Sequence, residues 1–301
     1  VPDHHLGVGS GSHAEQTGAM LVRIEGVIQQ EHPDVVLVYG DTNSTLAGAL
    51  AAAKLHVPVA HVEAGLRSFD RTMPEEVNRV LTDHVASLLF CPTTTAARNL
   101  VREGITDGVS VTGDVMVDAL LFNRDLAARG SGVLDRLDLT SGRYLVLTVH
   151  RASNTDDPRR LAAIMETVGR ADHPVVFPVH PRTRHALAEH GIGLPSNVIA
   201  VEPLGYLDML RLMGESRRIL TDSGGVQKEA YLLGVPCITL RETTEWVETI
   251  ELGWNALVGT SPEGILEAVR APDPTGPRPP VYGDGQAAEA IVREIEEFVG
   301  D

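Results

Sequence analysis

Short runs of consecutive apolar residues alternate along the chain with longer segments whose apolar positions recur at helical spacing. The runs predict strands at residues 35–39, 57–62, 88–91, 109–112, 144–149, 175–179, 198–201, 218–221, 237–240 and 256–258. The amphipathic segments predict helices at residues 14–31, 44–55, 75–86, 94–103, 115–129, 159–169, 183–190, 207–214, 226–233, 262–269 and 286–299. Such alternation, with nearly continuous apolar strands, is typical of α/β proteins built on parallel, doubly wound sheets.

One glycine-rich segment interrupts this alternation and predicts a domain boundary. Gly130-Ser131-Gly132 is followed by a stretch without clear apolar period up to Gly142. We therefore expect one Rossmann-like domain at residues 1–130 and a second at residues 143–285, facing each other across a cleft. Residues 272–285 are rich in proline and glycine, and the final helix, within residues 286–301, is expected to cross back to the first domain.

Composition narrows the classes of partner. Aromatic residues make up only 4% of the chain while hydrophobic residues make up 43%, which favours an aliphatic core of helices packed on parallel sheets. The formal charge of −16 disfavours nucleic acid and anionic membranes as partners. No apolar run reaches the length of a membrane span, and the first residues do not resemble a signal peptide.

The two cysteines predict a cellular compartment. Cys91 and Cys237 each lie inside a short apolar run, which favours buried free thiols over a disulfide. A reducing cytoplasm is the expected location.

Polar residues follow the predicted strands directly, at the edge where doubly wound sheets bind ligands. A single histidine or aspartate at such a position is usually a helix cap or a satisfied core group, but these residues recur in both halves of the chain. They are Asp41, His61, Glu63, His150, Arg151, His180 and Asp222.

Ser223-Gly224-Gly225 stands between a predicted strand and a predicted helix. A helix that starts there presents unpaired backbone amides and the positive end of its dipole, which suits a phosphate. Glu229, further along the same helix, is placed to meet a ribose hydroxyl. An ordinary helix capped by Asp222 or Ser223 would show the same residues.

Two acidic segments of the first half are candidates for acid/base chemistry. Glu63 follows a buried strand, and Arg67, four residues on, is a cation that could hold it. Glu75 and Glu76 begin a helix after Pro74, where acids also complement the helix dipole. Paired carboxylates in different environments can hold different protonation states, as proton transfer to and from carbon or oxygen requires.

Several cofactor motifs are absent from the sequence. Residues 7–12 resemble a dinucleotide fingerprint, but Ser12 occupies the last glycine position and no acidic residue follows at the required distance. Ser12 instead pairs with Glu15 as a predicted capping box. No Walker loop, nucleophile elbow or paired metal-ligand histidines occur. We therefore expect neither a cofactor nor a metal ion.

The chain resembles the non-hydrolysing UDP-N-acetylglucosamine 2-epimerases. The residues that carry the resemblance extend over most of the chain, and the run from His61 to Arg67 is highly specific. They are Gly40-Asp41-Thr42, His61-Val62-Glu63-Ala64-Gly65-Leu66-Arg67, Pro74-Glu75-Glu76 with Asn78-Arg79, His150-Arg151 with Asn154, and Asp222-Ser223-Gly224-Gly225-Val226-Gln227.

This resemblance implies a fold, a reaction and roles for residues. The family has two lobes of the glycosyltransferase B class, is usually dimeric, and interconverts UDP-GlcNAc and UDP-ManNAc by anti elimination of UDP and its re-addition to a 2-acetamidoglucal. Asp41, Glu63 and Glu75 would be the acid/base carboxylates, any of which could take the carbon 2 proton, with His150 near the leaving diphosphate. The implied substrate ligands are Arg67, Arg79, Arg151, His180, Ser223, Gly224, Gly225 and Glu229.

The chain also departs from the family pattern. Many members have Glu where this chain has Ser153, Glu where it has Lys228, and Arg-Pro where it has Trp246-Val247; we expect Lys228 to add charge near the diphosphate. The family opens with a further strand and loop, so the first domain is expected to lack its N-terminal strand.

Three alternative functions remain open. A hydrolysing epimerase would release UDP and ManNAc, and a non-catalytic nucleotide-sugar-binding protein would not need the acid/base set. A UDP-sugar-dependent glycosyltransferase is less favoured.

Overall fold

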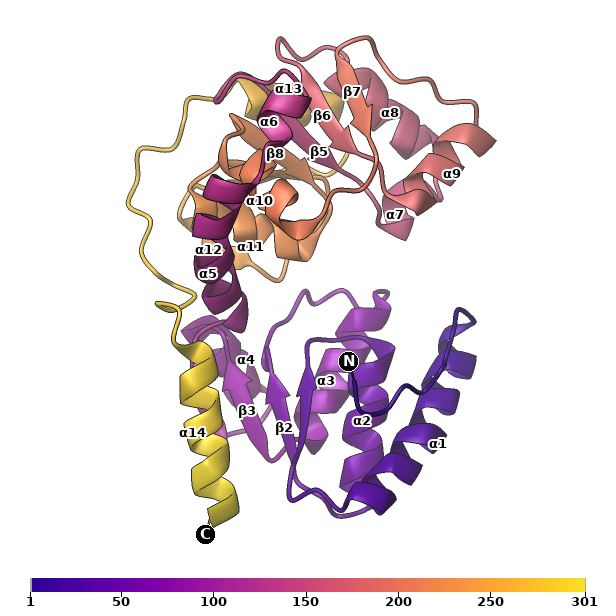
Figure 1. Cartoon of the computed structure of the whole chain (residues 1–301), viewed down its shortest axis with the longest axis vertical. Helices are drawn as coiled ribbons and strands as arrows, with labels where there is room; N and C mark the ends of the chain where they lie inside the picture. The colour runs from indigo at the N-terminus through magenta and orange to yellow at the C-terminus, as the bar shows by residue number, and fades with distance from the viewer. Residues whose placement is uncertain (1, 301) are drawn as a thin grey trace. The chain divides into compact units, whose positions relative to one another are not determined.

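The computed structural model describes residues 2–300, which fold as two compact units. The first unit runs to Ala119 and resumes at Pro280, and the second is Leu120–Pro279 (Figure 1). The first unit therefore contains segments from both ends of the chain.

The first unit is built on a four-stranded parallel sheet. Its strands are β1 (Val36–Tyr39), β2 (Val59–Val62), β3 (Leu88–Cys91) and β4 (Val109–Val111), in the order β1-β2-β3-β4. Residues of β2 alternate between two cores, because Val59 packs on one face of the sheet with Ile28 while Ala60 packs on the other with Phe90. Both faces are thus covered, as in other parallel sheets.

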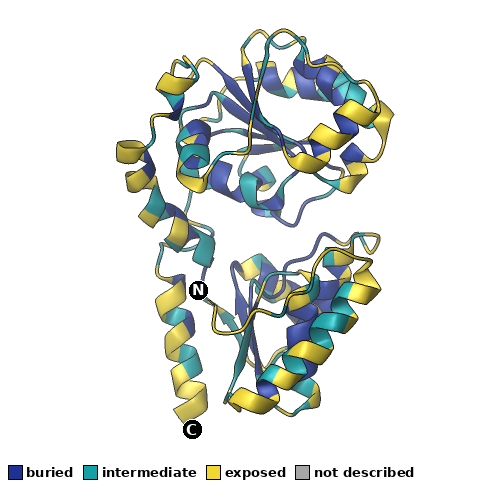
Figure 2. Cartoon of the chain, turned by 45° about the vertical axis from the view of Figure 1, so that its right-hand side comes forward, coloured by how far each residue is buried: buried dark blue, intermediate teal, exposed yellow. Residues whose placement is uncertain are grey.

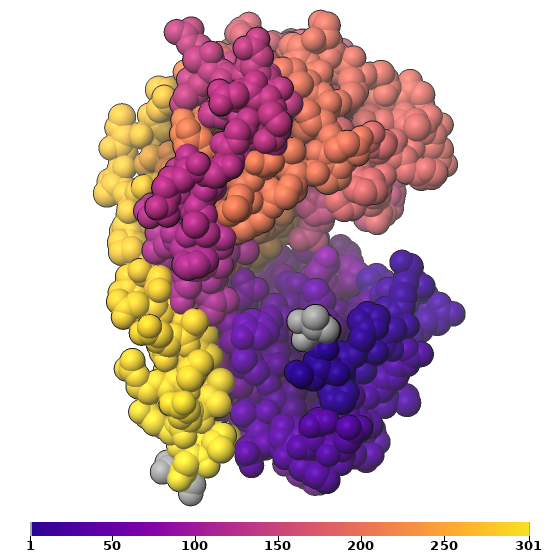
Figure 3. Space-filling model, viewed as in Figure 1, coloured from indigo at the N-terminus to yellow at the C-terminus, as the bar shows by residue number. Residues whose placement is uncertain are grey.

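Six helices surround this sheet. They are α1 (His13–Glu31), α2 (Asn43–Lys54), α3 (Pro74–Val85), α4 (Thr94–Arg102), the start of α5 (Val115–Gly130), and α14 (Ala287–Gly300). Helix α1 begins with the predicted capping box of Ser12 and Glu15. Helix α14 lies along the surface of this unit (Figure 3), where Ile291 packs against Val62 and Phe90.

The second unit is built on a six-stranded parallel sheet. Its strands are β5 (Leu145–Thr148), β6 (Val175–Pro178), β7 (Val198–Val201), β8 (Arg218–Thr221), β9 (Cys237–Thr239) and β10 (Asn255–Leu257), in the order β10-β9-β8-β5-β6-β7. The strand order reverses between the adjacent strands β5 and β8, which is where doubly wound sheets bind ligands. All ten predicted strands are confirmed.

Eight helices of the second unit cover two aliphatic cores, with the central strands fully buried (Figure 2). They are α6 (Val133–Arg136), α7 (Ala152–Thr155), α8 (Pro158–Val168), α9 (Pro181–Glu189), α10 (Tyr206–Gly214), α11 (Gly224–Leu233), α12 (Val247–Glu251) and α13 (Pro262–Arg270). Helices α6, α7 and α12 were not predicted, because four or five residues are too few to show a helical period. None of the helices within residues 2–300 has the length and hydropathy that a membrane span needs.

The division between the units lies earlier than the sequence predicts. Leu120 and Ala127, in the middle of α5, are buried in a core of the second unit together with Tyr144. The glycine-rich segment begins at Gly130, the last residue of this helix, and lies within the second unit. The predicted boundary is therefore corrected to α5, because side-chain packing and not backbone composition fixes it.

Both cysteines are free and buried, as predicted. Burial raises the pKa of each thiol to about 12. The thiolate is therefore disfavoured at both positions.

A tight turn follows β2 and carries the candidate site residue Glu63. Glu63 and Gly65 both have positive φ, 71° and 77°. The turn is fixed by hydrogen bonds from the Ala64 amide to the Phe90 carbonyl, 3.1 Å, and from Asn99 Nδ2 to the Gly65 carbonyl, 3.0 Å. A Cβ at Gly65 would collide with the backbone carbonyl of Ala96, so only glycine fits.

Replacing Gly65 by alanine should therefore destabilise the protein by about 3 kcal/mol or more, since backbone strain and a steric clash combine. Gly104→Ala is the matched control, because Gly104 also has positive φ, 85°, but no atom lies within 4 Å of the position that a Cβ would take there. The control should cost about 1 kcal/mol. Urea unfolding of the two variants measures both values, and equal losses would contradict the assigned clash.

Candidate active site

Asp41 follows β1 and is held at its side chain and at its backbone. The Arg79 guanidinium, on α3, forms an ion pair with the Asp41 carboxylate. Asn78 Nδ2 donates to the Asp41 carbonyl oxygen at 2.9 Å. The Asp41 side chain is 30% exposed, so the carboxylate is oriented by α3 and still reachable from solvent.

Glu63 lies beside the turn that carries Asp41. Its Oε2 would be 3.3 Å from a Cβ at Gly40, the residue that precedes Asp41. Gly40 itself has a φ of 63°. Glu63 is one of five non-glycine residues with positive φ among residues 2–300, a strained conformation that tends to cluster at functional sites. The structure thus brings two of the three predicted acid/base residues to neighbouring turns.

The two glutamates at the start of α3 differ in their environments. Glu75, the second residue of the helix, is half-buried. Glu76 is 1% exposed and accepts hydrogen bonds from the Ser68 amide and hydroxyl, both at 2.9 Å, and from the Phe69 amide at 3.0 Å. It also pairs with Arg79 at 3.0 Å. Glu76 therefore anchors the loop before α3, in addition to complementing the helix dipole.

Two predicted substrate-binding arginines have structural partners instead. Arg67 is 3% exposed, and its guanidinium pairs with Asp83 and Glu103, each at 2.7 Å. It does not hold Glu63 as the sequence suggested. Arg79 is equally buried and joins Asp41 to Glu76. We therefore correct the role of Arg67 to anchoring its own loop and that of Arg79 to orienting Asp41.

In the second unit a buried carboxylate organises the switch point of the sheet. Asp222, after β8, is fully buried. It accepts hydrogen bonds from the backbone amides of His150 and Arg151, each at 3.0 Å, and from Asn154 Nδ2 at 3.1 Å. Three donors on the segment after β5 are thus fixed by one carboxylate on the neighbouring strand.

His150 and His180 lie together above this carboxylate. Their ring centroids are 5.5 Å apart, and His150 Nδ1 lies 3.3 Å from the Asp222 carboxylate. His180 caps α9, since its Nδ1 accepts from the Arg182 amide at 3.2 Å. Both rings and Ser223 line a cavity of about 210 Å³, smaller than the roughly 300–1,000 Å³ of whole-ligand sites and suited to part of a ligand.

The protonation of His150 follows from its burial. Burial lowers the pKa of the ring, the charge of Asp222 opposes that shift, and the charges of Arg151, His180 and Arg182 add to it. The net effect is a pKa below the ordinary value. His150 is thus neutral at pH 7, where it can accept a proton or donate a hydrogen bond.

Helix α11 begins at the same cavity. Ser223 is its N-cap, but the hydroxyl makes no capping hydrogen bond, and the Asp222 carboxylate is used by the β5 segment. A Cβ at Gly224 would collide with the Glu245 carboxylate, so this glycine allows the loop before α12 to pack closely. The first amides of a ten-residue helix, including that of Gly225, are suited to bind an anion.

Glu229 is nearly buried on α11. Burial raises the pKa of its carboxyl, and a hydrogen bond with Tyr206 and the charge of Lys228 oppose that shift only in part. Tyr206, the first residue of α10, was not predicted as a site residue. Lys228 is fully buried, with its ammonium 4.1 Å from the centre of the Trp246 ring. The structure thus adds a cation–π contact with Trp246 to the predicted role of Lys228 as a charge near the diphosphate.

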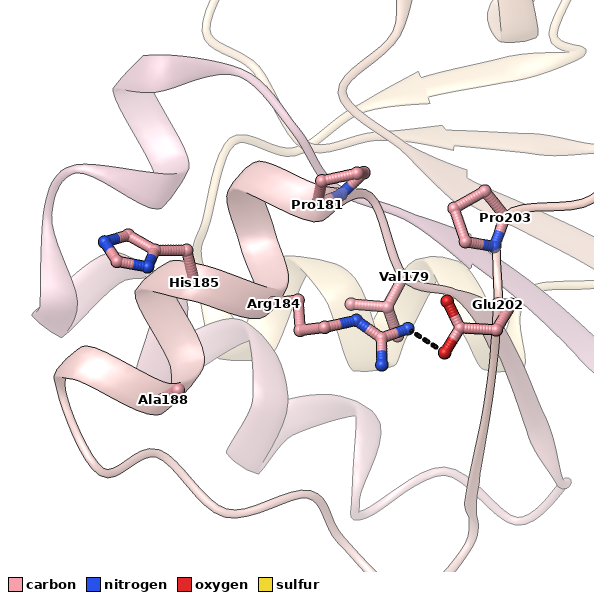
Figure 4. A pocket seen from close by; sticks show the side chains of 7 residues that line it. All are labelled: Val179, Pro181, Arg184, His185, Ala188, Glu202 and Pro203. Carbon is pink, nitrogen blue, oxygen red and sulfur yellow. Dashed lines mark ion pairs between the residues drawn. The ribbon is translucent and has the colours of Figure 1, made fainter.

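A larger hollow of about 480 Å³ lies beside α9 and contains none of the predicted site residues. Figure 4 shows Arg184 and Glu202 pointing toward each other across it as an ion pair, 2.8 Å long. Within residues 2–300 no three His, Cys, Asp or Glu side chains are grouped so that they could hold a metal ion.

Comparison with known proteins decides the family. The model of the UDP-N-acetylglucosamine 2-epimerase family matches residues 1–296. The chain belongs to this family. A UDP-N-acetylglucosamine 2-epimerase from Methanocaldococcus jannaschii is 48% identical over 306 residues, covering 97% of this chain and 83% of that protein. The family predicted from the sequence is confirmed, and its epimerases are isomerases.

One further relative and one solved structure are informative for this epimerase chain. A UDP-2,3-diacetamido-2,3-dideoxy-D-glucuronate 2-epimerase from Pseudomonas aeruginosa is 48% identical, covering 98% of this chain and 83% of that protein. The crystal structure of the Methanocaldococcus jannaschii UDP-GlcNAc 2-epimerase in complex with UDP-GlcNAc and UDP superposes with a TM-score of 0.92 at 47% identity. It covers 99% of this chain and 85% of that one, which confirms the predicted fold class of two parallel α/β sheets.

The lowered pKa of His150 makes stability of this family member depend on pH. Protonation of His150 favours the unfolded chain. The contribution of neutral His150 to the free energy of unfolding is therefore fully present above its ordinary pKa of 6.5 and is lost as pH falls through the lower folded-state pKa. We expect the Tm to fall as pH decreases below about 6.5, and His150→Gln to flatten part of that fall. His185→Gln, at an exposed position of α9, should follow the wild-type profile. Parallel profiles for wild type and His150→Gln would contradict the prediction.

Proposed function

We propose that this chain interconverts UDP-GlcNAc and UDP-ManNAc. In this proposal UDP is eliminated anti to the hydrogen on carbon 2, a 2-acetamidoglucal forms, and UDP adds back with carbon 2 inverted. The observation that carries the proposal is the placement of two carboxylates, Asp41 and Glu63, on neighbouring turns after β1 and β2. Acid/base groups at such strand ends supply the proton transfers that this elimination needs.

Each unit has a separate role in the proposal. The carboxylates of Asp41, Glu63 and Glu75 move protons at the sugar, with Arg79 orienting Asp41. In the second unit the amides of Gly224 and Gly225 and the Ser223 hydroxyl hold the diphosphate. His150, Arg151 and His180 support the leaving group, and Glu229 with Tyr206 binds the ribose. The structures of two solved relatives contain UDP, which supports a UDP-sugar as the substrate.

The neutral form of His150 gives the leaving diphosphate a hydrogen-bond donor at pH 7. A homodimer in the cytoplasm completes the proposal, supported by the family resemblance and by the two buried free thiols.

One alternative substrate has a specific observation in its favour. The Pseudomonas aeruginosa relative, which is named for a 2,3-diacetamido uronate, is as similar to this chain as the Methanocaldococcus jannaschii relative is. Both sugars carry the acetamido group and the hydrogen at carbon 2, so the same elimination applies to either. Turnover of the two UDP-sugars side by side distinguishes them.

Incubation with UDP-GlcNAc in D2O tests the reaction. A carboxylic acid proton exchanges with water once the site opens, so the expected product is UDP-ManNAc with deuterium at carbon 2. Mass spectrometry and proton NMR measure the label and the products. Epimerised product that keeps its original carbon 2 hydrogen would contradict the carboxylate roles. So would a single turnover in which substrate deuterated at carbon 2 keeps its deuterium. Free ManNAc and UDP would instead identify a hydrolysing epimerase, and UDP-GlcNAc left unchanged would identify a binding protein.

Two glutamate variants should separate chemistry from binding. Glu63→Gln is expected to lower kcat by about 100-fold or more, because a lost proton carrier acts on the transition state. Its dissociation constant for UDP should change little. Glu229→Ala should raise that dissociation constant by about 10-fold, the worth of one hydrogen bond to a charged group. Calorimetry measures the dissociation constant for UDP, and steady-state kinetics measure kcat. If Glu63→Gln weakened UDP binding and Glu229→Ala lowered kcat, the two assigned roles would have to be exchanged. Glu25→Gln, at a partly exposed position on α1, is the common control.

A further inference from the structure

A tyrosine at the start of α10 is joined to the glutamate that the proposed function assigns to the ribose. Tyr206, the first residue of α10, shares a hydrogen bond with the side chain of Glu229 on α11. The two helices are held together by a common core, in which Leu210 and Met213 of α10 are buried with Ala230 of α11. Core packing therefore brings the two side chains together.

The direction of this hydrogen bond follows from the chemistry of the two groups. Burial raises the pKa of the Tyr206 phenol, and the charge of Glu229 and the hydrogen bond with it raise that pKa further, so the phenol keeps its proton. The phenol is the donor and a carboxyl oxygen of Glu229 is the acceptor. Because a carboxylate can accept at both of its oxygens, Tyr206 leaves Glu229 with capacity for a hydroxyl of a ligand.

Burial makes the orientation of Glu229 depend on its donors. The residue is 8% exposed, so water can replace a missing hydrogen-bond partner only in part. A carboxylate at this depth turns toward the groups that donate to it, since an unmet acceptor is costly there. The phenol of Tyr206 occupies one side of the carboxylate and so fixes which side faces a ligand.

The pair lies close in sequence to the lining of the cavity beside His150 and His180. Leu204 and Met209, which line that cavity of about 210 Å³, stand on either side of Tyr206 in the chain. Ser223, at the start of α11, lines it too. Glu229 lies four residues beyond Gly225, about 6 Å along the helix axis, so a single nucleotide can bridge the diphosphate amides and this carboxylate.

We propose that Tyr206 is a positioning residue, whose hydroxyl orients the Glu229 carboxylate toward the ribose and so makes the site select nucleotides that carry the ribose hydroxyls. The inference rests on the proposed function, in which Glu229 binds the ribose. A nucleotide without those hydroxyls leaves the oriented, buried carboxylate with one partner fewer, and a site built to bind a hydroxyl rejects an analogue that lacks it.

Binding of UDP and of 2′,3′-dideoxy-UDP to the full chain, measured by calorimetry, tests this. The wild type should bind UDP about 10-fold more tightly than the dideoxy analogue. Tyr206→Phe removes only a hydroxyl and should reduce this ratio to about 3-fold or less by weakening UDP. The dissociation constant of the analogue should change by less than about 2-fold, because the analogue offers no hydroxyl to Glu229.

Two further variants show whether the effect passes through the carboxylate. Added to Glu229→Ala, Tyr206→Phe should change neither dissociation constant further, since the group on which it acts is already gone. Tyr206→Met also keeps an apolar side chain without the hydroxyl, and it should reduce the ratio as Tyr206→Phe does.

Tyr231→Phe is the matched control, because it removes a buried hydroxyl from α11 itself. That hydroxyl donates to the Pro279 carbonyl at 2.6 Å. The control should lower Tm but keep the wild-type preference for UDP over the analogue. A Tyr206→Phe protein that binds both nucleotides more weakly by the same factor, or that keeps the wild-type ratio, would overturn the inference.

The same measurements separate the inference from the proposed function. Equal affinities of the wild type for the two nucleotides, or a ratio that Glu229→Ala leaves unchanged, would reject the ribose role of Glu229 and the inference with it. A ratio that is lost in Glu229→Ala but kept in Tyr206→Phe would reject only the inference. Binding needs no turnover, so the result holds even for a chain that does not epimerise UDP-GlcNAc.

Discussion

In each unit the candidate site residues depend on a buried carboxylate that accepts hydrogen bonds from turns at the ends of neighbouring strands. Asp222 fixes the segment after β5 in the second unit, and Asp83 fixes the turn after β2 in the first. Each is about fully buried, so each would be strongly destabilising without its donors. Each of these turns is therefore held in one arrangement, because any shift of the turn leaves a buried charge without a partner.

This constraint explains why charged residues outnumber apolar ones on the inner face of α3. Glu76, Arg79 and Asp83 lie at helical spacing on one side of that helix, and all three are nearly inaccessible to water. Arg79 and Arg67 neutralise the carboxylates in pairs, so the helix packs against the sheet through ion pairs where most helices use aliphatic side chains. Replacing one partner of such an ion pair leaves the other buried charge unpaired, which is destabilising. The partly exposed Asp41 carboxylate stays accessible to solvent, because its partner Arg79 is the buried residue of that pair.

The sequence predicted the strands, the residues at the strand ends and all helices except the short α6, α7 and α12, because these features follow from local periodicity. The sequence suggested Arg67 as a partner of Glu63, and both Arg67 and Arg79 as substrate ligands. It could not show their ion pairs, because a short distance in sequence between a cation and a glutamate does not determine which buried carboxylate the cation contacts in space. It missed Asp83 and Tyr206, although the spacing of Glu76, Arg79 and Asp83 already indicated a shared helix face. Lys228 and Trp246 were noted as separate departures from the family, and only the structure shows them in contact. The domain boundary was displaced because core packing of Leu120 outweighs a glycine-rich segment.

The packing of α14 on the first sheet has a consequence for how the chain folds during synthesis. Strands β1 to β4 leave the ribosome early, but the face formed by Ala60, Val62 and Phe90 acquires Ile291 only after the whole second unit has been translated. At roughly 5–20 residues per second that interval is roughly 10–40 s. The second unit, made of one continuous segment, is free to fold first. The earlier strands meanwhile present an apolar face without Ile291 and Ile295, and transiently exposed surface of this kind favours aggregation.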